Sequence, residues 1–210
     1  MTFNPASIRV LTVDDHPLMR QGIAVMIENQ PDMALLPQAA TANEGIRIFR
    51  EHRPDVTLMD LRLPDIGGID ALIAIRNEFP DARVIMLTTF EGDVEVQRAL
   101  AVGARGYVLK SSPADELVQA IRQVHAGKKR LSAPIATRLA ENLGQESLTP
   151  REVEVLMQVA EGNRNQDIAG RLNISEETVK VHIKHIMEKL GARDRTQAIT
   201  IAIRRGIIAL

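Results

Sequence analysis

Cysteine and tryptophan are absent from the 210 residues, and aromatic residues make up only 2% of the chain. Without cysteine the protein can have no disulfide, no thiolate nucleophile and no cysteine-bound zinc. No apolar run approaches the roughly 20 residues that a membrane-spanning helix needs, and residues 1–7 lack the charged and hydrophobic regions of a signal peptide. These absences favour a globular protein that stays in the cytoplasm and does not enter a membrane.

An excess of charge of one sign is also absent, because 26 Lys and Arg stand against 27 Asp and Glu. The two kinds of charge are unevenly distributed along the chain. From Ser147 onward there are 10 basic and 8 acidic residues, whereas the preceding part has 16 basic and 19 acidic residues. An acidic front and a mildly basic back predict different partners for the two parts.

The front part alternates strand-like apolar runs with helical patterns up to about residue 126. This alternation predicts an α/β doubly wound domain with a five-stranded parallel sheet covered by helices on both faces. The expected strands lie near 8–13, 33–38, 56–60, 83–88 and 106–109. The expected helices lie near 17–29, 42–51, 68–79, 93–102 and 113–126, with glycines at 103 and 127 as C-terminal stops.

Polar side chains follow four of these strands. Asp14 and Asp15 follow the first strand, Asp60 ends the third, Thr88 ends the fourth and Lys110 follows the fifth. Because ligands of open parallel sheets bind at the carboxyl ends of the strands, these groups are expected to converge. Carboxylates suit Mg²⁺, and a lysine and a hydroxyl suit phosphoryl oxygens. The pattern predicts a phosphoryl-transfer site with Asp60 as the nucleophile.

The back part has no strand pattern and is expected to consist of short helices. Thr149-Pro150-Arg151-Glu152 is a capping box with proline at the first helical position. A second helix carries the apolar residues near 168–172, and the turn at 173–175 leads into a third helix. This arrangement is a helix-turn-helix. The expected division is a domain at 7–126, a linker with a short helix at 127–146 and the helical domain at 147–210.

The third helix of this part presents basic residues on the face opposite its apolar stripe. Lys180 and Lys184 are four residues apart and therefore lie one above the other, with Val181 and His185 beside them. Lysines can reach guanine edges or phosphates and Val181 can touch a thymine methyl, as in a recognition helix. A solvated basic surface is the alternative. The last helix carries a second apolar stripe, for which packing within the domain and dimerisation are both open: Ala198, Ile199, Ala202 and Ile203.

The front motifs resemble the receiver domain of two-component response regulators over about residues 7–126. The resemblance rests on Val13-Asp14-Asp15-His16-Pro17, Met59-Asp60-Leu61-Arg62-Leu63-Pro64, Leu87-Thr88-Thr89-Phe90 and Gly106-Tyr107-Val108-Leu109-Lys110. It implies that Asp60 accepts a phosphoryl group from a sensor histidine kinase. It also implies an Mg²⁺ site made by Asp14, Asp15, Asp60 and the carbonyl of Arg62, and a switch made by Thr88 and Tyr107.

The back part resembles the LuxR-type helix-turn-helix domain, and the whole chain therefore resembles the NarL/FixJ family of response regulators. This likeness rests on the segments 148–152, 161–163, 167–169 and 177–182, whereas Arg164 stands where a small capping residue is usual. It implies base contacts by Lys180, Val181 and Lys184, with Thr178 and His185 near phosphates. The implied partners are double-stranded promoter half-sites and a second copy when phosphorylated, with RNA polymerase as a further candidate.

Three other functions compete with this interpretation. An aspartyl-phosphate phosphatase uses the same kind of aspartate, but residue 62 is arginine where that class has a second aspartate. A dinucleotide-binding protein would need a Gly-x-Gly-x-x-Gly run after the first strand, which is lacking. A DNA-binding regulator whose receiver works without phosphate remains the main alternative. The expected protein is a phosphoacceptor and transcription factor whose only turnover would be loss of its own phosphoryl group.

Overall fold

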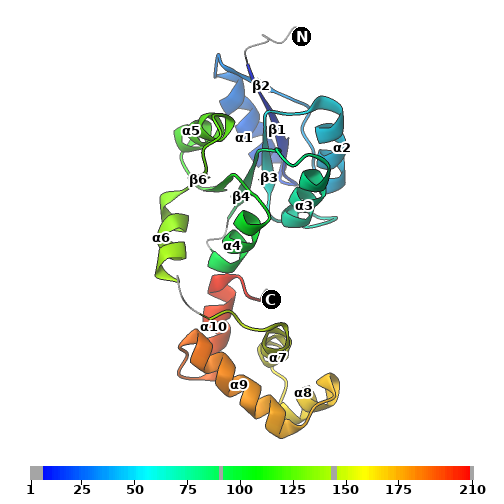
Figure 1. Ribbon diagram of the computed structural model, residues 1–210, viewed down its shortest axis with the longest axis vertical. Coiled ribbons are helices and arrows are strands. Elements are labelled where there is room, and N and C mark those ends of the chain that lie inside the picture. The colour runs from blue at the N-terminus through cyan, green and yellow to red at the C-terminus, as the bar shows by residue number, and fades with distance from the viewer. Residues whose placement is uncertain (1–6, 90–91, 143–145, 209–210) are drawn as a thin grey trace. The chain divides into compact units, whose positions relative to one another are not determined.

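The computed structural model of the chain describes residues 7–89, 92–142 and 146–208 (Figure 1). Phe90 of the third receiver motif, residues 143–145 of the expected linker and the last two residues lie outside the described residues. The chain divides into two compact units, the first mostly residues through Ala136 and the second mostly residues from Thr137 on. Among the helices described, none combines the length and the apolar character that spanning a membrane requires.

The first unit is built on a parallel sheet in which the strands follow the order β2-β1-β3-β4-β5-β6. The strands are β1 (Ile8–Val13), β2 (Met33–Leu35), β3 (Val56–Asp60), β4 (Val84–Thr88), β5 (Gly106–Leu109) and β6 (Arg130–Leu131). The order reverses between β1 and β3, so polar groups at their carboxyl ends flank a crevice of the kind that binds ligands in doubly wound sheets. The predicted α/β class is confirmed.

The sheet has six described strands, not the predicted five. The additional strand β6 lies in the segment expected to be a linker. The Arg130 amide donates to the Arg105 carbonyl at 3.0 Å, and the Ser132 amide donates to the Tyr107 carbonyl at 3.1 Å. A strand of two residues is too short to show an alternating pattern, so the sequence gives no signal for it.

Strand β2 ends earlier than predicted, at Leu35 instead of residue 38. The Leu36 amide still donates to the Val10 carbonyl at 2.9 Å. Pro37 follows and has no amide hydrogen to extend the ladder. The apolar run therefore overstates the length of the strand.

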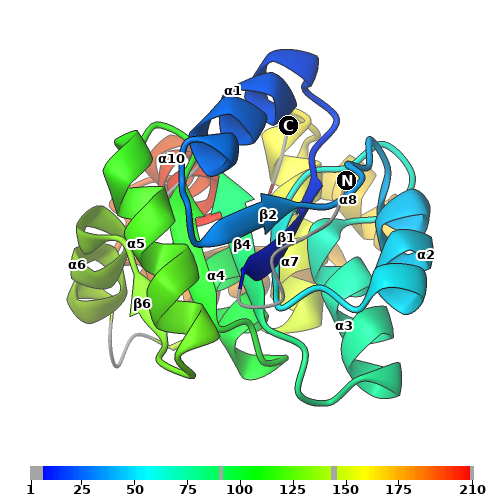
Figure 2. The ribbon, with the colours of Figure 1, turned by 90° about the horizontal axis from the view of Figure 1, so that it is seen from above.

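Helices cover both faces of the sheet (Figure 2). One face carries α1 (Pro17–Glu28) and α5 (Ala114–His125), and the other carries α2 (Ala42–His52) and α3 (Gly68–Glu78). The helix α4 (Asp93–Ala101) follows β4. Apolar residues of the strands pack against α1 and α5 in one buried cluster: Ile8, Val10, Val56, Leu58, Ile85, Leu87, Val108, Ile23, Ile27, Leu117, Val118, Ala120, Ile121 and Val124.

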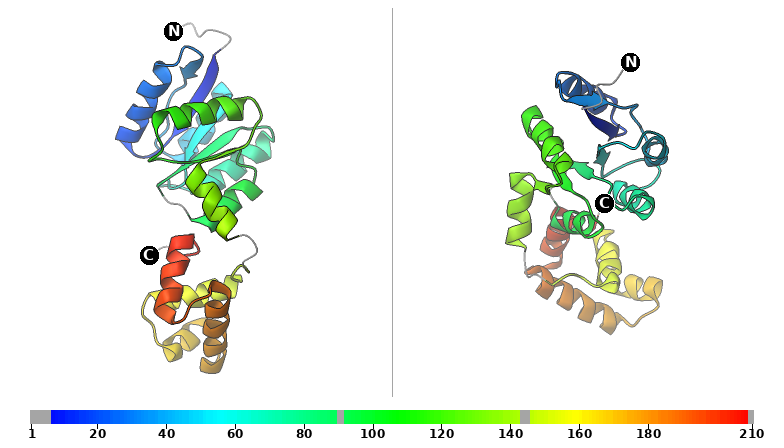
Figure 3. Two further views of the ribbon diagram at one scale, coloured as in Figure 1. Left: turned by 90° about the vertical axis from the view of Figure 1, so that its left-hand side faces the viewer. Right: turned by 45° about the horizontal axis from the view of Figure 1, so that its top comes forward.

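The short helix expected in the linker is α6 (Ala133–Glu141), which is longer than the one or two turns predicted. The second unit contains α7 (Pro150–Ala160), α8 (Asn165–Leu172), α9 (Glu176–Leu190) and α10 (Arg195–Arg205). In Figure 3 the orange α9 is the longest of these helices, and it packs against α7, α8 and α10. Asn173 ends α8 in the left-handed conformation, with φ of 53°, and starts the turn into α9.

The capping box predicted for α7 is present. The Thr149 amide donates to a Glu152 carboxylate oxygen at 2.7 Å, and the Glu152 amide donates to the Thr149 hydroxyl at 3.3 Å. The Lys189 ammonium of α9 lies 2.8 Å from the same Glu152 oxygen. The carboxylate therefore caps one helix and ties a second helix to it.

Candidate functional site

Three charged groups meet at the carboxyl edge of the sheet. The Lys110 Nζ lies 2.8 Å from Asp14 Oδ2 and 2.7 Å from Asp60 Oδ2. Asp14 is 0% exposed and Asp60 is 3% exposed. A single ammonium therefore bridges two carboxylates that are almost fully removed from solvent.

The strand register explains why these residues meet. Val13 pairs with Met59 in the β1–β3 ladder, so Asp14 and Asp60 occupy neighbouring places at the end of that ladder. Asp60 pairs in turn with Leu87 of β4. The Lys110 amide donates to the Thr88 carbonyl at 2.7 Å, which fixes the backbone from which the lysine reaches Asp60. The predicted convergence of Asp14, Asp60 and Lys110 is present.

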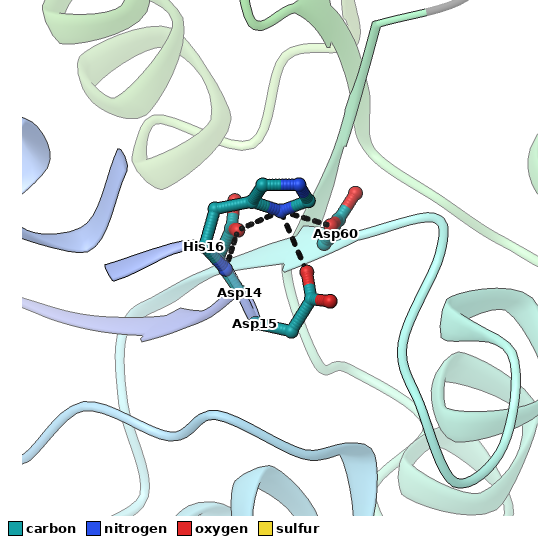
Figure 4. Close-up of side chains that lie close together, drawn as sticks. All are labelled: Asp14, Asp15, His16 and Asp60. Carbon is teal, nitrogen blue, oxygen red and sulfur yellow. Dashed lines mark hydrogen bonds and ion pairs between the residues drawn. The ribbon is translucent and has the colours of Figure 1, made fainter. Parts of the chain in front are cut away.

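His16 is a member of the cluster that the sequence reasoning did not select. Its Nδ1 lies 2.6 Å from Asp15 Oδ1, 3.2 Å from Asp14 Oδ1 and 4.0 Å from Asp60 Oδ2. Figure 4 shows the imidazole ring over these carboxylates. An ionised carboxylate only accepts hydrogen bonds, so the contacts with Asp14 and Asp15 are hydrogen bonds when Nδ1 carries a proton. The run Asp14-Asp15-His16 was the available signal, since it places a third polar side chain directly after the strand.

The buried surroundings change the protonation of the cluster. Burial raises the pKa of the Asp60 carboxyl; the Lys110 ammonium opposes this rise, and the Asp14 carboxylate adds to it. Burial alone would lower the pKa of Lys110, but its hydrogen bonds to Asp14 and Asp60 outweigh burial and raise that pKa. Lys110 therefore remains a cation at neutral pH and can face an anion.

The expected switch residues lie on the same face of neighbouring strands. Met86 pairs with Tyr107 and Thr88 pairs with Leu109 in the β4–β5 ladder, so Thr88 and Tyr107 are diagonal neighbours. Thr88 is 2% exposed and Tyr107 is fully buried. The expected coupling of these two side chains stays a prediction.

The chain following Asp60 turns sharply into α3. The Gly68 amide donates to the Leu61 carbonyl at 3.0 Å, and the Arg62 amide lies 3.4 Å from Asp60 Oδ1. A Cβ atom on Gly68 would lie 1.9 Å from the Asp60 carbonyl oxygen. Only glycine fits this approach, so Gly68 is a positioning residue that the sequence reasoning did not identify. The role of the Arg62 carbonyl as a ligand stays a prediction.

The cluster has the chemistry of a divalent-cation site. Asp14, Asp15, His16 and Asp60 bring one carboxylate oxygen or ring nitrogen each within 4.8 Å of one another, and the three carboxylates are the groups that suit a hard cation. Mg²⁺ prefers a few carboxylate oxygens together with water and phosphate oxygens. The partly exposed Asp15 leaves one side of the cluster open to solvent. The donor set therefore fits Mg²⁺, with Lys110 available for an oxyanion.

In the second unit, α9 has an apolar side and a polar side as predicted. Val179, Ile186 and Leu190 are buried in the helical core, with Ile183 and Met187 packed against them. On the opposite side the exposed residues include Lys180, Val181, Lys184 and His185. Thr178 is half-buried, and its amide donates the N-cap hydrogen bond to the Ser175 hydroxyl oxygen at 3.0 Å. Their contacts with DNA stay a prediction.

Arg164 at the start of α8 makes no side-chain cap hydrogen bond. A guanidinium has no acceptor, so it cannot receive an amide hydrogen. The Arg164 amide instead donates to Asp167 Oδ2 at 3.3 Å, which supplies the other half of a capping box. The helix forms despite the unusual capping residue.

The apolar stripe of α10 packs within the second unit. Ala198 and Ala202 are buried in its core, and Ile199 and Ile203 are half-buried against the same core. Packing within the domain therefore accounts for much of the stripe. Dimerisation through these residues stays a prediction.

Comparison with known proteins identifies both units. Residues 10–122 match the family described as "Response regulator receiver domain", and residues 146–202 match "Bacterial regulatory proteins, luxR family". The chain is 41% identical over 209 residues to the transcriptional regulatory protein LiaR of Bacillus subtilis, covering 96% of this chain and 99% of LiaR. It is 36% identical over 207 residues to the response regulator VraR of Staphylococcus aureus, covering 96% of this chain and 99% of VraR.

A solved structure supports the same assignment. RcsB of Salmonella enterica serovar Typhimurium, bound to a promoter in the presence of the phosphomimetic BeF3-, superposes with a TM-score of 0.73 at 28% identity. The match covers 93% of this chain and 97% of RcsB. The chain therefore belongs to the NarL/FixJ family of two-component response regulators, with a receiver domain followed by a LuxR-type helix-turn-helix domain.

Proposed function

We propose that this response regulator accepts a phosphoryl group on Asp60 and that the modification changes its binding to promoter DNA. The observation that carries the proposal is the Lys110 ammonium, 2.7 Å from Asp60 Oδ2 and 2.8 Å from Asp14 Oδ2. A cation between two buried carboxylates is placed to receive the oxyanion that forms when one of them is phosphorylated.

Asp60 is the nucleophile of this reaction. A carboxylate oxygen of Asp60 attacks the phosphorus in line, an acyl-phosphate bond forms, and the bond from phosphorus to the donor's leaving group breaks. The donor is a phosphohistidine of a sensor histidine kinase or a small acyl phosphate. Lys110 pairs with one phosphoryl oxygen, and the Thr88 hydroxyl donates to another.

Asp14, Asp15 and Asp60 would hold Mg²⁺, together with the Arg62 carbonyl. When bound there, Mg²⁺ would supply positive charge against the oxygens of the incoming phosphoryl group. The protein is an acceptor that is modified, not a turnover enzyme, and any hydrolysis would be loss of its own phosphoryl group.

Phosphorylation would act on the second unit through the switch pair. The modification adds about −1.5 to −2 charges at Asp60. Thr88 turns toward the phosphoryl group, and Tyr107 moves into the space that Thr88 leaves. The repacked surface favours a homodimer on paired half-sites or frees the DNA-binding helices. In either case the regulator would bind the promoter in the cytoplasm, where RNA polymerase can contact it.

The DNA contacts would come from the exposed side of α9. Lys180, Val181 and Lys184 would face base edges in the major groove, and Thr178 and His185 would lie near phosphates. RcsB has been observed bound to promoter DNA. The same mode of binding is proposed for this chain because its α9 presents two lysines on an exposed side and has a buried apolar side.

The test is incubation with acetyl phosphate and Mg²⁺, followed by phosphate-affinity gel mobility and intact mass. The wild type should gain one phosphoryl group, and Asp60→Asn should gain none. Asp81→Asn is the matched control, because Asp81 is an exposed acid of the same unit outside the cluster. Label in Asp60→Asn equal to that of the wild type would contradict the assignment of the nucleophile.

A further inference from the structure

The lysines on the exposed side of α9 are paired with acidic residues of the same helix. Lys180 Nζ lies 3.3 Å from Glu177 Oε2 and 3.6 Å from Glu176 Oε1. Lys184 Nζ lies 3.7 Å from Glu188 Oε1. The surface proposed to enter the DNA groove is therefore not purely basic, and its acidic groups require an explanation.

Glu177 lies on the part of α9 where base edges are read. It is the second residue of the helix, and the first turn of a recognition helix contacts bases. It precedes Val181 by four residues and Lys184 by seven, so the three side chains share one face. Glu176 lies to one side of that face. The Glu177 side chain is also the more exposed of the two, at 79% against 51% for Glu176.

A favourable interaction with the helix dipole explains an acid in the first turn but not its place on this face. A carboxylate near the sugar-phosphate backbone is repelled, and an ionised carboxylate can only accept hydrogen bonds. In the major groove the donors are the exocyclic amines of cytosine and adenine, and a carboxylate pairs best with cytosine N4. On DNA, the Glu177 carboxylate is therefore stabilised next to a cytosine amine and destabilised next to phosphates.

We propose that Glu177 is a specificity-determining residue that accepts a hydrogen bond from the N4 amine of one cytosine in each half-site. The proposal rests on the DNA-binding function proposed for α9. When Glu177 turns to the base, Lys180 exchanges its partner on the helix for a guanine edge or a phosphate. Where cytosine is missing, the carboxylate is left desolvated without a donor, which disfavours the wrong sequence.

The experiment is selection of bound duplexes from a randomised double-stranded oligonucleotide pool by the full chain treated with acetyl phosphate and Mg²⁺. The wild type should enrich a motif with a fixed cytosine in each half-site. Glu177→Gln should replace that cytosine with adenine, because an amide pairs with adenine N6 and N7. Glu177→Ala should leave the position unselected, with discrimination there reduced roughly tenfold or more.

Glu188→Gln is the matched control. Like Glu177→Gln, this substitution removes one negative charge from α9 and one acidic partner from a lysine, here Lys184. Glu188, however, lies near the C-terminal end of the helix. This variant should enrich the wild-type motif. If Glu177→Gln also enriches the wild-type motif unchanged, the proposal for Glu177 is wrong while DNA binding by α9 stands. If the wild type enriches no motif, sequence-specific DNA binding itself fails, and the role of Glu177 fails with it.

Discussion

At the residue scale, the receiver site depends on one cation between two carboxylates. Asp14 and Asp60 are buried beside each other and both contact Lys110. Removing one partner of a buried ionic group leaves an uncompensated charge, which costs more than the intact group contributes. The same lysine therefore serves the stability of the unmodified protein and the binding of the phosphoryl group.

Lys110→Met should lower the free energy of unfolding in the absence of Mg²⁺ by about 3 kcal/mol, because both carboxylates lose their cation. Urea unfolding with and without Mg²⁺ measures this effect, and Mg²⁺ should restore more stability to the variant than to the wild type. Lys128→Met is the control, since Lys128 is exposed and outside the cluster. Equal stability of Lys110→Met and wild type without Mg²⁺ would show that the bridge is not stabilising.

Sequence reasoning found the cluster because the polar side chains follow strands, and parallel strands end at one edge of the sheet. This argument placed Asp14, Asp60 and Lys110 correctly. It could not place His16, because a loop side chain has no periodicity and its direction depends on the turn. Gly68 was missed for a similar reason, since its close approach to the Asp60 carbonyl is a contact across the turn.

Gly68→Ala is the second test at this scale. The added methyl would overlap the Asp60 carbonyl oxygen, so the backbone that carries Asp60 must shift. We expect a loss of about 1–3 kcal/mol in unfolding free energy and slower labelling by acetyl phosphate. Gly22→Ala is the matched control, because Gly22 lies within α1 and its Cβ would meet nothing within 4 Å. Normal labelling of Gly68→Ala would show that the turn tolerates the displacement.

At the scale of elements, Glu152 joins α7 to α9. Burial raises the pKa of this carboxyl, but the hydrogen bonds from Lys189 and Thr149 outweigh burial and hold it below its usual value. A group with a depressed folded pKa contributes stability above its unfolded pKa and loses that contribution as the pH falls through the folded pKa. The ordinary value is 4.5, so the loss begins near that pH and continues below it.

Glu152→Gln should therefore cost about 1–2 kcal/mol of unfolding free energy at pH 7, and the cost should shrink as the pH falls below about 4.5. Chemical unfolding of the full chain at several pH values, followed by helical circular dichroism, measures both effects. Glu154→Gln is the control, because Glu154 lies on the same helix and its pair with Arg151 is exposed. A pH-independent difference between Glu152→Gln and the wild type would refute the ionic contribution.

The elements were largely predictable because each long one has a periodic apolar pattern and a recognisable stop. The capping box at Thr149 and Glu152 gave the start of α7 directly. Two details were not predictable. Strand β6 is too short to have a pattern. Strand β2 stops just before Pro37, which has no amide hydrogen for the ladder, and an apolar pattern does not show this.

At the scale of the whole molecule, the chain carries two units with different chemistry. In the receiver, buried carboxylates and a lysine lie together at the carboxyl edge of the sheet. In the helical unit, basic and acidic side chains alternate along the exposed side of α9. The sequence indicated both functions, since each depends on motifs in consecutive residues. The coupling between the two units depends on how phosphorylation of Asp60 changes the surface of the receiver. No pattern in the sequence encodes the free energy of that coupling.

The most direct test of the central proposal is the affinity for a selected DNA duplex before and after treatment with acetyl phosphate and Mg²⁺, for wild type and Asp60→Asn. Coupling of the usual size predicts a change of roughly 5- to 150-fold for the wild type and none for Asp60→Asn. An equal change in both proteins, or an unchanged affinity in wild type that is fully labelled on Asp60, would contradict the phosphorylation switch.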